Sequence, residues 1–162
     1  MSFSSDIKQE LARIEAEKQC CMLAEIAGFV RMAGSIKLSG GGRLDLKIAT
    51  ENPAIARLFL KRIKTSFGVG ADLSVNQKAL SKKGHVYELV IGAEDKSEEI
   101  LRATGILQVE DGLKFFPEGI ASDRVKTKCC RKAFLRGAFI GAGTISDPEK
   151  AYHLEIVANN EV

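Results

Sequence analysis

The chain has 162 residues, of which 45% are hydrophobic and 28% charged, a composition that excludes a largely disordered protein. The net charge of +3 permits contact with nucleic acid without requiring it. The charged N-terminus is unlike a secretory signal, and no apolar run approaches the roughly 20 residues of a membrane-spanning helix. The chain has four cysteines, and free cysteine thiols are typical of proteins in a reducing compartment. We therefore expect a cytoplasmic protein without membrane contact.

Two helices open the chain. Residues 1–17 predict an amphipathic arm, in which apolar residues recur at helical spacing at Ile7, Leu11 and Ile14. Residues 19–33 are apolar or small almost all round, which predicts a helix buried on most sides and ended by Gly34. Gly28 lies inside that helix, where glycine costs about 1 kcal/mol relative to alanine. We infer that another backbone approaches closely at this position.

Strands and short helices follow. Residues 35–38 and 43–49 flank a glycine-rich turn and predict a hairpin, with a charged row alternating with Leu44, Leu46 and Ile48. A helix is expected from Pro53 to Phe67. The remaining predicted elements of this part are strands near 73–76 and 85–91, separated by a polar loop over 78–84, and a short helix over 97–104. An antiparallel sheet with one open face is the expected result.

The sequence repeats itself at an offset of 109 residues. Residues 20–36 (CCMLAEIAGFVRMAGSI) match residues 129–145 (CCRKAFLRGAFIGAGTI) at positions that include Cys20, Ala24, Gly28, Ala33, Gly34 and Ile36 of the first copy. Such a match indicates two copies of one unit packed about a pseudo-twofold axis. Residues 152–158 match the second strand of the first copy, and the chain then ends where further elements of a second copy are expected.

This pattern predicts an α+β fold in four segments. They are an arm over 1–17, a first unit over 18–105, a connector over 106–127 and the truncated start of a second unit over 128–162. Between the two units, we expect Gly28, Ala33, Gly137 and Ala142 to form the repeat interface.

The repeated stretches, IAGFVRMAGSI at 26–36 and LRGAFIGAGTI at 135–145, resemble the LAGLIDADG motif of homing endonucleases. This resemblance implies two motif helices packed at the domain centre and a saddle of sheets over duplex DNA. In that family the last acidic residue of each motif holds the divalent metal, and the matching residues here are Ala33 and Ala142. Alanine has no oxygen to ligate Mg²⁺, so we expect no metal, no cofactor and no nuclease activity.

Almost the whole chain also resembles the WhiA family, through the opening SFSSDIKQELARIE, the cysteine pair before LAEIAGFVRMAGSI and the segment CCRKAFLRGAFIGAGTISDPEKAYHLEI. The resemblance implies a bacterial regulator linked to sporulation, cell division and chromosome segregation. In that family a degenerate endonuclease-like domain precedes a C-terminal helix-turn-helix, which this sequence does not contain. The resemblance therefore also implies a location at the nucleoid.

Two groups of basic residues are candidate DNA contacts. Lys37, Arg43 and Lys47 belong to strands whose other face is apolar, although Asp45 shares their row. Residues 114–136 carry a local excess of five positive charges and include Lys126, Lys128 and Arg131. Either group is also consistent with an ordinary solvated surface.

The four cysteines form two adjacent pairs. Because neighbouring helical residues point in different directions, we expect poor chelation of a metal and a packing role for these thiols.

The sequence is consistent with three functions. The first is a non-catalytic domain that binds double-stranded DNA, and the second is an active nuclease, which Ala33 and Ala142 disfavour. The third is a platform for partner proteins or a nucleotide, with DNA recognition in a C-terminal part outside this sequence. Binding of DNA that weakens with salt would separate the first from the third.

Overall fold

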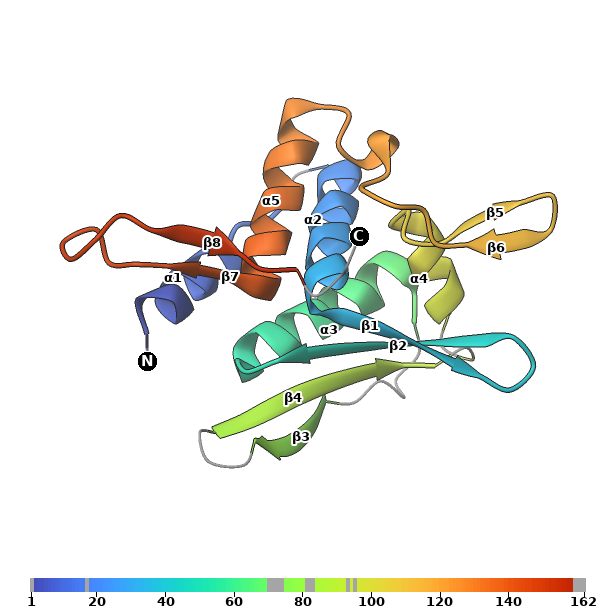
Figure 1. Cartoon of the computed structure of the whole chain (residues 1–162), viewed down its shortest axis with the longest axis horizontal. Coiled ribbons are helices and arrows are strands. Elements are labelled where there is room, and N and C mark those ends of the chain that lie inside the picture. The colour runs from blue at the N-terminus through green and yellow to red at the C-terminus, as the bar shows by residue number, and fades with distance from the viewer. Residues whose placement is uncertain are drawn as a thin grey trace.

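Two helices stand side by side above a sheet in the computed structural model, which describes residues 2–16, 18–69, 75–80, 84–92, 94 and 96–158. The helices are α2 (Gln19–Ala33) and α5 (Lys128–Ala142), and each leads directly into a strand (Figure 1). The expected α+β fold with a repeated helix-and-hairpin unit is confirmed.

The first unit contains a four-stranded antiparallel sheet. Its strands are β1 (Gly34–Ser39), β2 (Arg43–Thr50), β3 (Val75–Leu80) and β4 (Gly84–Ile91), in the order β1-β2-β4-β3. Strand β2 alternates as its sequence predicts, because Leu44, Leu46 and Ile48 are all buried. β3 runs to residue 80, so the loop expected from residue 78 is wrong at its start, while residues 81–83 lie outside the described part.

Helices cover one face of this sheet. The side chain of Asn52 caps α3 (Pro53–Phe67) by accepting a hydrogen bond from the Ala54 amide, 3.0 Å away, and Gly68 ends it in the left-handed conformation. The Phe59 ring of α3 stacks on Phe29 of α2 at 3.7 Å between centroids. The helix α4 (Ser97–Ala103) adds Ile100 and Leu101 to the core. The opposite face of the sheet is open (Figure 1).

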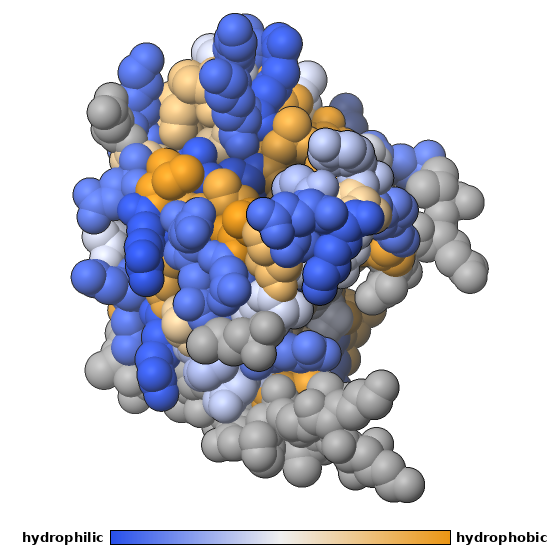
Figure 2. Space-filling view, turned by 90° about the vertical axis from the view of Figure 1, so that its left-hand side faces the viewer, coloured by the Kyte–Doolittle hydropathy of each residue, from blue (hydrophilic) through white to orange (hydrophobic). Residues whose placement is uncertain are grey.

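The second unit contributes α5 and a hairpin of β7 (Gly143–Ile145) and β8 (Leu154–Ile156). The arm helix α1 (Phe3–Ala12) is fixed to this hairpin, because the Ser4 hydroxyl donates to the Ile145 carbonyl at 2.9 Å and accepts from its amide at 2.8 Å. Figure 2 shows this side of the molecule, where apolar surface lies among hydrophilic side chains.

The expected connector has structure of its own. It contains a hairpin of β5 (Gln108–Glu110) and β6 (Leu113–Phe115), followed by the 3₁₀ helix η2 (Ser122–Arg124). The hairpin turn is Asp111-Gly112, with φ angles of 51° and 77°. An Asp-Gly pair is a typical two-residue hairpin signal, which the prediction of a connector over 106–127 did not use.

The seam between α2 and α5 is a contact of backbone against backbone. A methyl group added to Gly28 would overlap the Phe134 carbonyl oxygen and lie 2.9 Å from the Ala138 nitrogen. A methyl group on Gly137 would overlap the Glu25 carbonyl oxygen and lie 3.0 Å from the Phe29 nitrogen. These reciprocal contacts leave no room for side chains at either glycine and relate the two helices as a pseudo-twofold axis requires.

We expect Gly28→Ala to lower the free energy of unfolding by about 2 kcal/mol, because the added methyl group forces the two backbones apart. The drop in melting temperature would be roughly 4 to 8 °C for a chain of this size. Thermal unfolding followed by circular dichroism measures it. Gly40→Ala is the matched control, since a methyl group there meets no atom within 4 Å. Alanine has the higher helix propensity, so an unchanged or raised melting temperature for Gly28→Ala would contradict the close approach.

Candidate nucleic-acid interface

The open face of the sheet carries three of the predicted DNA-contacting residues. Lys37 on β1 and Arg43 on β2 are exposed, and Lys47 lies further along β2. Lys37 stands directly opposite Asp45 across the β1–β2 pair, and the Lys47 ammonium lies 2.9 Å from the Glu88 carboxylate of β4.

Positive and negative charges therefore alternate across this face. The Glu88 carboxylate is 11% exposed and holds Lys47, which leaves less of the Lys47 charge available to a phosphate. The sequence showed Asp45 in this row, but only strand pairing reveals that Glu88 lies beside Lys47. Lys37 and Arg43, close to the turn between β1 and β2, are the more accessible cations.

The other predicted group lies at the opposite end of the motif helices. Lys126, Lys128 and Arg131 are exposed around the start of α5. The Arg131 guanidinium donates hydrogen bonds to the Val125 and Lys126 carbonyls, at 3.0 and 3.2 Å, and so fixes the loop that enters the helix. A helix of 15 residues is about 22 Å long, so the six predicted residues form two separate basic groups and not one surface.

The last residues of the two motif helices are Ala33 and Ala142, and both are half-buried. A cavity of about 1150 Å³ lies beside Ala142, between the second unit and the ends of the first sheet. Glu51 provides the carboxylate among the described residues that line it, and Lys8 lines it as well. Burial lowers the pKa of Lys8, and the charge of Glu51 opposes that shift.

A buried acidic residue holds three helices together and was missed by the sequence interpretation. Glu25 of α2 is 1% exposed, and its Oε2 accepts a hydrogen bond from Nε of Arg136 on α5 at 2.8 Å. The same oxygen forms an ion pair with the Arg136 Nη2, 2.7 Å away. The other oxygen of Glu25 contacts the guanidinium of Arg62 on α3. Burial lowers the pKa of both arginines, and the charge of Arg136 lowers that of Arg62 further. The available signal was Glu25 as the single carboxylate of a mostly apolar helix, because a buried carboxylate requires a cation beside it.

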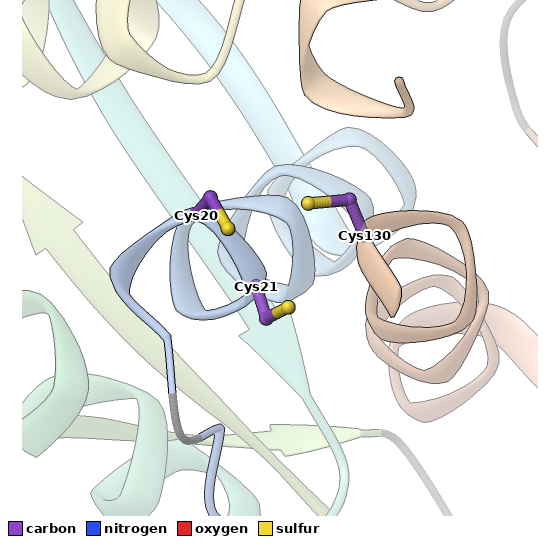
Figure 3. A group of neighbouring side chains, drawn as sticks. All are labelled: Cys20, Cys21 and Cys130. Atoms are coloured by element: carbon purple, nitrogen blue, oxygen red, sulfur yellow. The ribbon is translucent and has the colours of Figure 1, made fainter. Parts of the chain in front are cut away.

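The cysteines meet at the start of the two motif helices. Cys21 and Cys130 are buried in a small cluster between the helices, as expected of packing groups, while Cys20 and Cys129 are exposed. The sulfur atoms of Cys20, Cys21 and Cys130 all lie within 4.8 Å of one another (Figure 3). The expectation that adjacent cysteines point apart is therefore wrong, because it treated each helix alone and the seam aligns their first turns.

The thiols differ in acidity. Hydrogen bonds to Thr127 and Cys21 lower the pKa of Cys129 to about 7, with the charge of Lys18 acting in the same direction. The hydrogen bond with Cys129, together with burial, raises the pKa of Cys21 to about 12. Cys129 is accordingly the more reactive of these two thiols near neutral pH.

We expect Glu25→Gln to lower the free energy of unfolding by about 3 kcal/mol or more, because the Arg62 and Arg136 side chains, only 14% and 15% exposed, lose their counter-charge. Urea denaturation measures the change. Glu99→Gln is the matched control, since that carboxylate is 58% exposed and lies 3.9 Å from Lys96, and its loss should cost less than about 1 kcal/mol. Equal effects of the two substitutions would contradict the role assigned to Glu25.

Two comparisons by sequence give concordant results. Residues 19–107 match the WhiA N-terminal LAGLIDADG-like domain, and residues 131–162 match the WhiA LAGLIDADG-like domain. The "Probable cell division protein WhiA" of Alkaliphilus metalliredigens is 44% identical over 161 residues, which are 99% of this chain and 51% of that protein. The protein of the same name from Desulforamulus reducens is 42% identical, over 99% of this chain and 49% of its own length. The chain thus spans about half the length of these curated relatives.

Solved structures share the fold. The N-terminal LAGLIDADG domain of DUF199/WhiA aligns with a TM-score of 0.68 at 19% identity, over 98% of this chain and 67% of that one. Full-length DUF199/WhiA from Thermotoga maritima aligns with a TM-score of 0.62 at 22% identity, over 99% and 46%. Among the described residues, no helix is both long and apolar enough to cross a membrane. With family matches covering more than half of its residues, the chain belongs to the WhiA family.

Proposed function

We propose that this chain is a non-catalytic domain that binds double-stranded DNA within a bacterial regulator of cell division. The observation that carries the proposal is the pair of exposed cations, Lys37 and Arg43, near the tip of the β1–β2 hairpin on the open face of the sheet. That hairpin extends beyond the helices (Figure 1). A two-stranded ribbon with basic side chains fits a groove of duplex DNA.

The second basic group supports the same function in a different way. Lys126, Lys128 and Arg131 surround the start of α5, far from the open sheet face. Contacts with phosphates there would add affinity without reading sequence. Because the two groups lie at opposite ends of the seam, we propose that the sheet face is the primary contact and that the start of α5 meets a more distant stretch of backbone.

The ends of the motif helices support a function other than hydrolysis. Ala33 and Ala142 stand where the LAGLIDADG resemblance places metal-binding carboxylates, and alanine offers no ligand atom. Glu51 alone cannot provide the paired ligands that a two-metal reaction needs.

The wider role rests on the relatives. They are named cell division proteins, and the family resemblance adds transcription regulation, sporulation and chromosome segregation. We propose that the domain acts in these processes at the nucleoid.

A platform for a partner protein is the second candidate, favoured by apolar side chains beside the β5–β6 hairpin. Leu113 is 73% exposed, and Phe116 and Ile120 are each 48% exposed. Exposed apolar residues gathered on one segment are typical of protein contacts. The alternation of charge on the open sheet face is also compatible with a protein partner or a nucleotide.

DNA binding is tested by fluorescence anisotropy of a labelled duplex at several salt concentrations. We expect the Lys37→Gln/Arg43→Gln variant to bind more weakly and to lower the salt dependence, d log K/d log[salt], by about 2, because each lost phosphate contact removes about 0.9. Lys61→Gln is the matched control, since Lys61 is an exposed lysine on α3, on the covered side of the sheet. Weak, salt-independent binding by the parent would contradict the proposal and favour the platform.

Catalysis is tested separately with supercoiled plasmid and Mg²⁺. We expect no nicking above the protein-free background, because neither motif helix ends in a carboxylate. Gel electrophoresis over a time course measures it. Nicking that is abolished by a chelator would show that the domain is an active nuclease.

A further inference from the structure

The far end of the α2–α5 seam from the sheets gathers all four cysteines of the chain. Cys20 and Cys21 occupy the first turn of α2, and Cys129 and Cys130 occupy the first turn of α5. The close backbone approach at Gly28 and Gly137 aligns the two helices in parallel, so their first turns come together. In Figure 3 the Cys130 sulfur points from α5 toward α2, and the sulfurs of Cys20 and Cys21 lie on the side of α2 near it.

The spacing of these sulfurs suits a thiophilic metal ion. Zn²⁺ binds cysteine sulfur at about 2.3 Å, which places the sulfurs of a tetrahedral site about 3.8 Å apart. The Cys20, Cys21 and Cys130 sulfurs already lie within 4.8 Å of one another. Side-chain adjustments on the order of 1 Å would complete the geometry. Among the described residues, this is the one group of three or more potential ligands gathered so closely.

Cys129 is the candidate for a fourth ligand. Cys129 precedes Cys130 in the first turn of α5, and its sulfur lies 3.1 Å from the Thr127 hydroxyl oxygen. It is exposed, so its side chain is free to turn toward the other three. The exposure of Cys20 and Cys129 also leaves an ion a path to the buried Cys21 and Cys130.

The surroundings favour the charge that such a site would carry. Zn²⁺ with four thiolates has a net charge of −2, and the N-terminal ends of α2 and α5 each present a partial positive charge to it. Lys18, Lys126 and Lys128 flank the cysteines in the chain and add full positive charges. Beneath the sulfurs, Ala24, Ala27 and Ala133 form an apolar floor that excludes water.

We propose that Cys20, Cys21 and Cys130, completed by Cys129, bind a thiophilic divalent cation of the Zn²⁺ type. The ion clamps the first turns of α2 and α5 at the end of the seam remote from the sheets. The site lies beside the second basic group at the start of α5 and remote from the open sheet face, which is the primary DNA contact proposed above. Its ligands are other residues than the proposed DNA contacts, so the test below does not depend on DNA binding.

The test titrates the reduced, metal-free chain with Zn²⁺ against a chromophoric chelator, and with Co²⁺ as an optical probe. The expected result is one ion per chain, a thiolate-to-cobalt charge-transfer band and a higher melting temperature with Zn²⁺. Cys20→Ser is the key variant, because Cys20 is exposed and its replacement leaves the core intact. It should bind Zn²⁺ at least tenfold more weakly than the parent while its metal-free melting temperature stays unchanged.

Lys132→Ser is the matched control, an exposed residue of α5 whose loss leaves all four thiols in place. It should bind Zn²⁺ within about twofold of the parent, because one screened surface charge contributes little. Absence of the cobalt–thiolate band in the parent, or equal affinity of the parent and Cys20→Ser, would overturn the proposal. Failure to bind Zn²⁺ combined with a disulfide between α2 and α5 after mild oxidation, located by mass spectrometry, would also overturn it and assign the thiols to redox chemistry.

Discussion

The approach of two helix backbones at Gly28 and Gly137 is the constraint on which the rest of the structure depends. Each glycine lies against main-chain atoms of the other helix, so the seam fixes both the separation of α2 and α5 and their register. Because each helix runs directly into a strand, this register also sets where β1 and β7 begin. The positions of the hairpins follow from one contact in which neither helix can accept a side chain.

The seam also divides the molecule by chemical character. The helix C-terminal ends lead to the sheets, where basic and acidic side chains alternate on the open face. The N-terminal ends carry the thiols and the second basic group. A helix of 15 residues keeps the two regions about 22 Å apart. The alternating charges of the sheet face and the four thiols therefore lie at opposite ends of the two helices.

Glu25 adds polar specificity to the apolar seam. A carboxylate buried between two guanidiniums gives little net stability compared with apolar packing, yet removing one partner is costly because a charge is left in a low-dielectric interior. Arg136 comes from α5 and Arg62 from α3, so the cluster is satisfied only when the two units and the helix covering the sheet are all in place. The arrangement links the correct docking of the second unit to the core of the first.

Local patterns in the sequence determined the elements and the duplication. The alternation of Leu44, Leu46 and Ile48 predicted β2, because the period of a strand is visible within one element. The glycine repeated in both helices predicted their close approach, because a missing side chain is visible in the sequence itself. The β5–β6 hairpin had a signal of its own, Asp111-Gly112, that was overlooked. Tertiary structure alone decided that Glu88 holds Lys47, that Glu25 joins three helices and that the cysteines converge. These contacts join residues distant in the chain, and their geometry exists only after the helices and strands have packed.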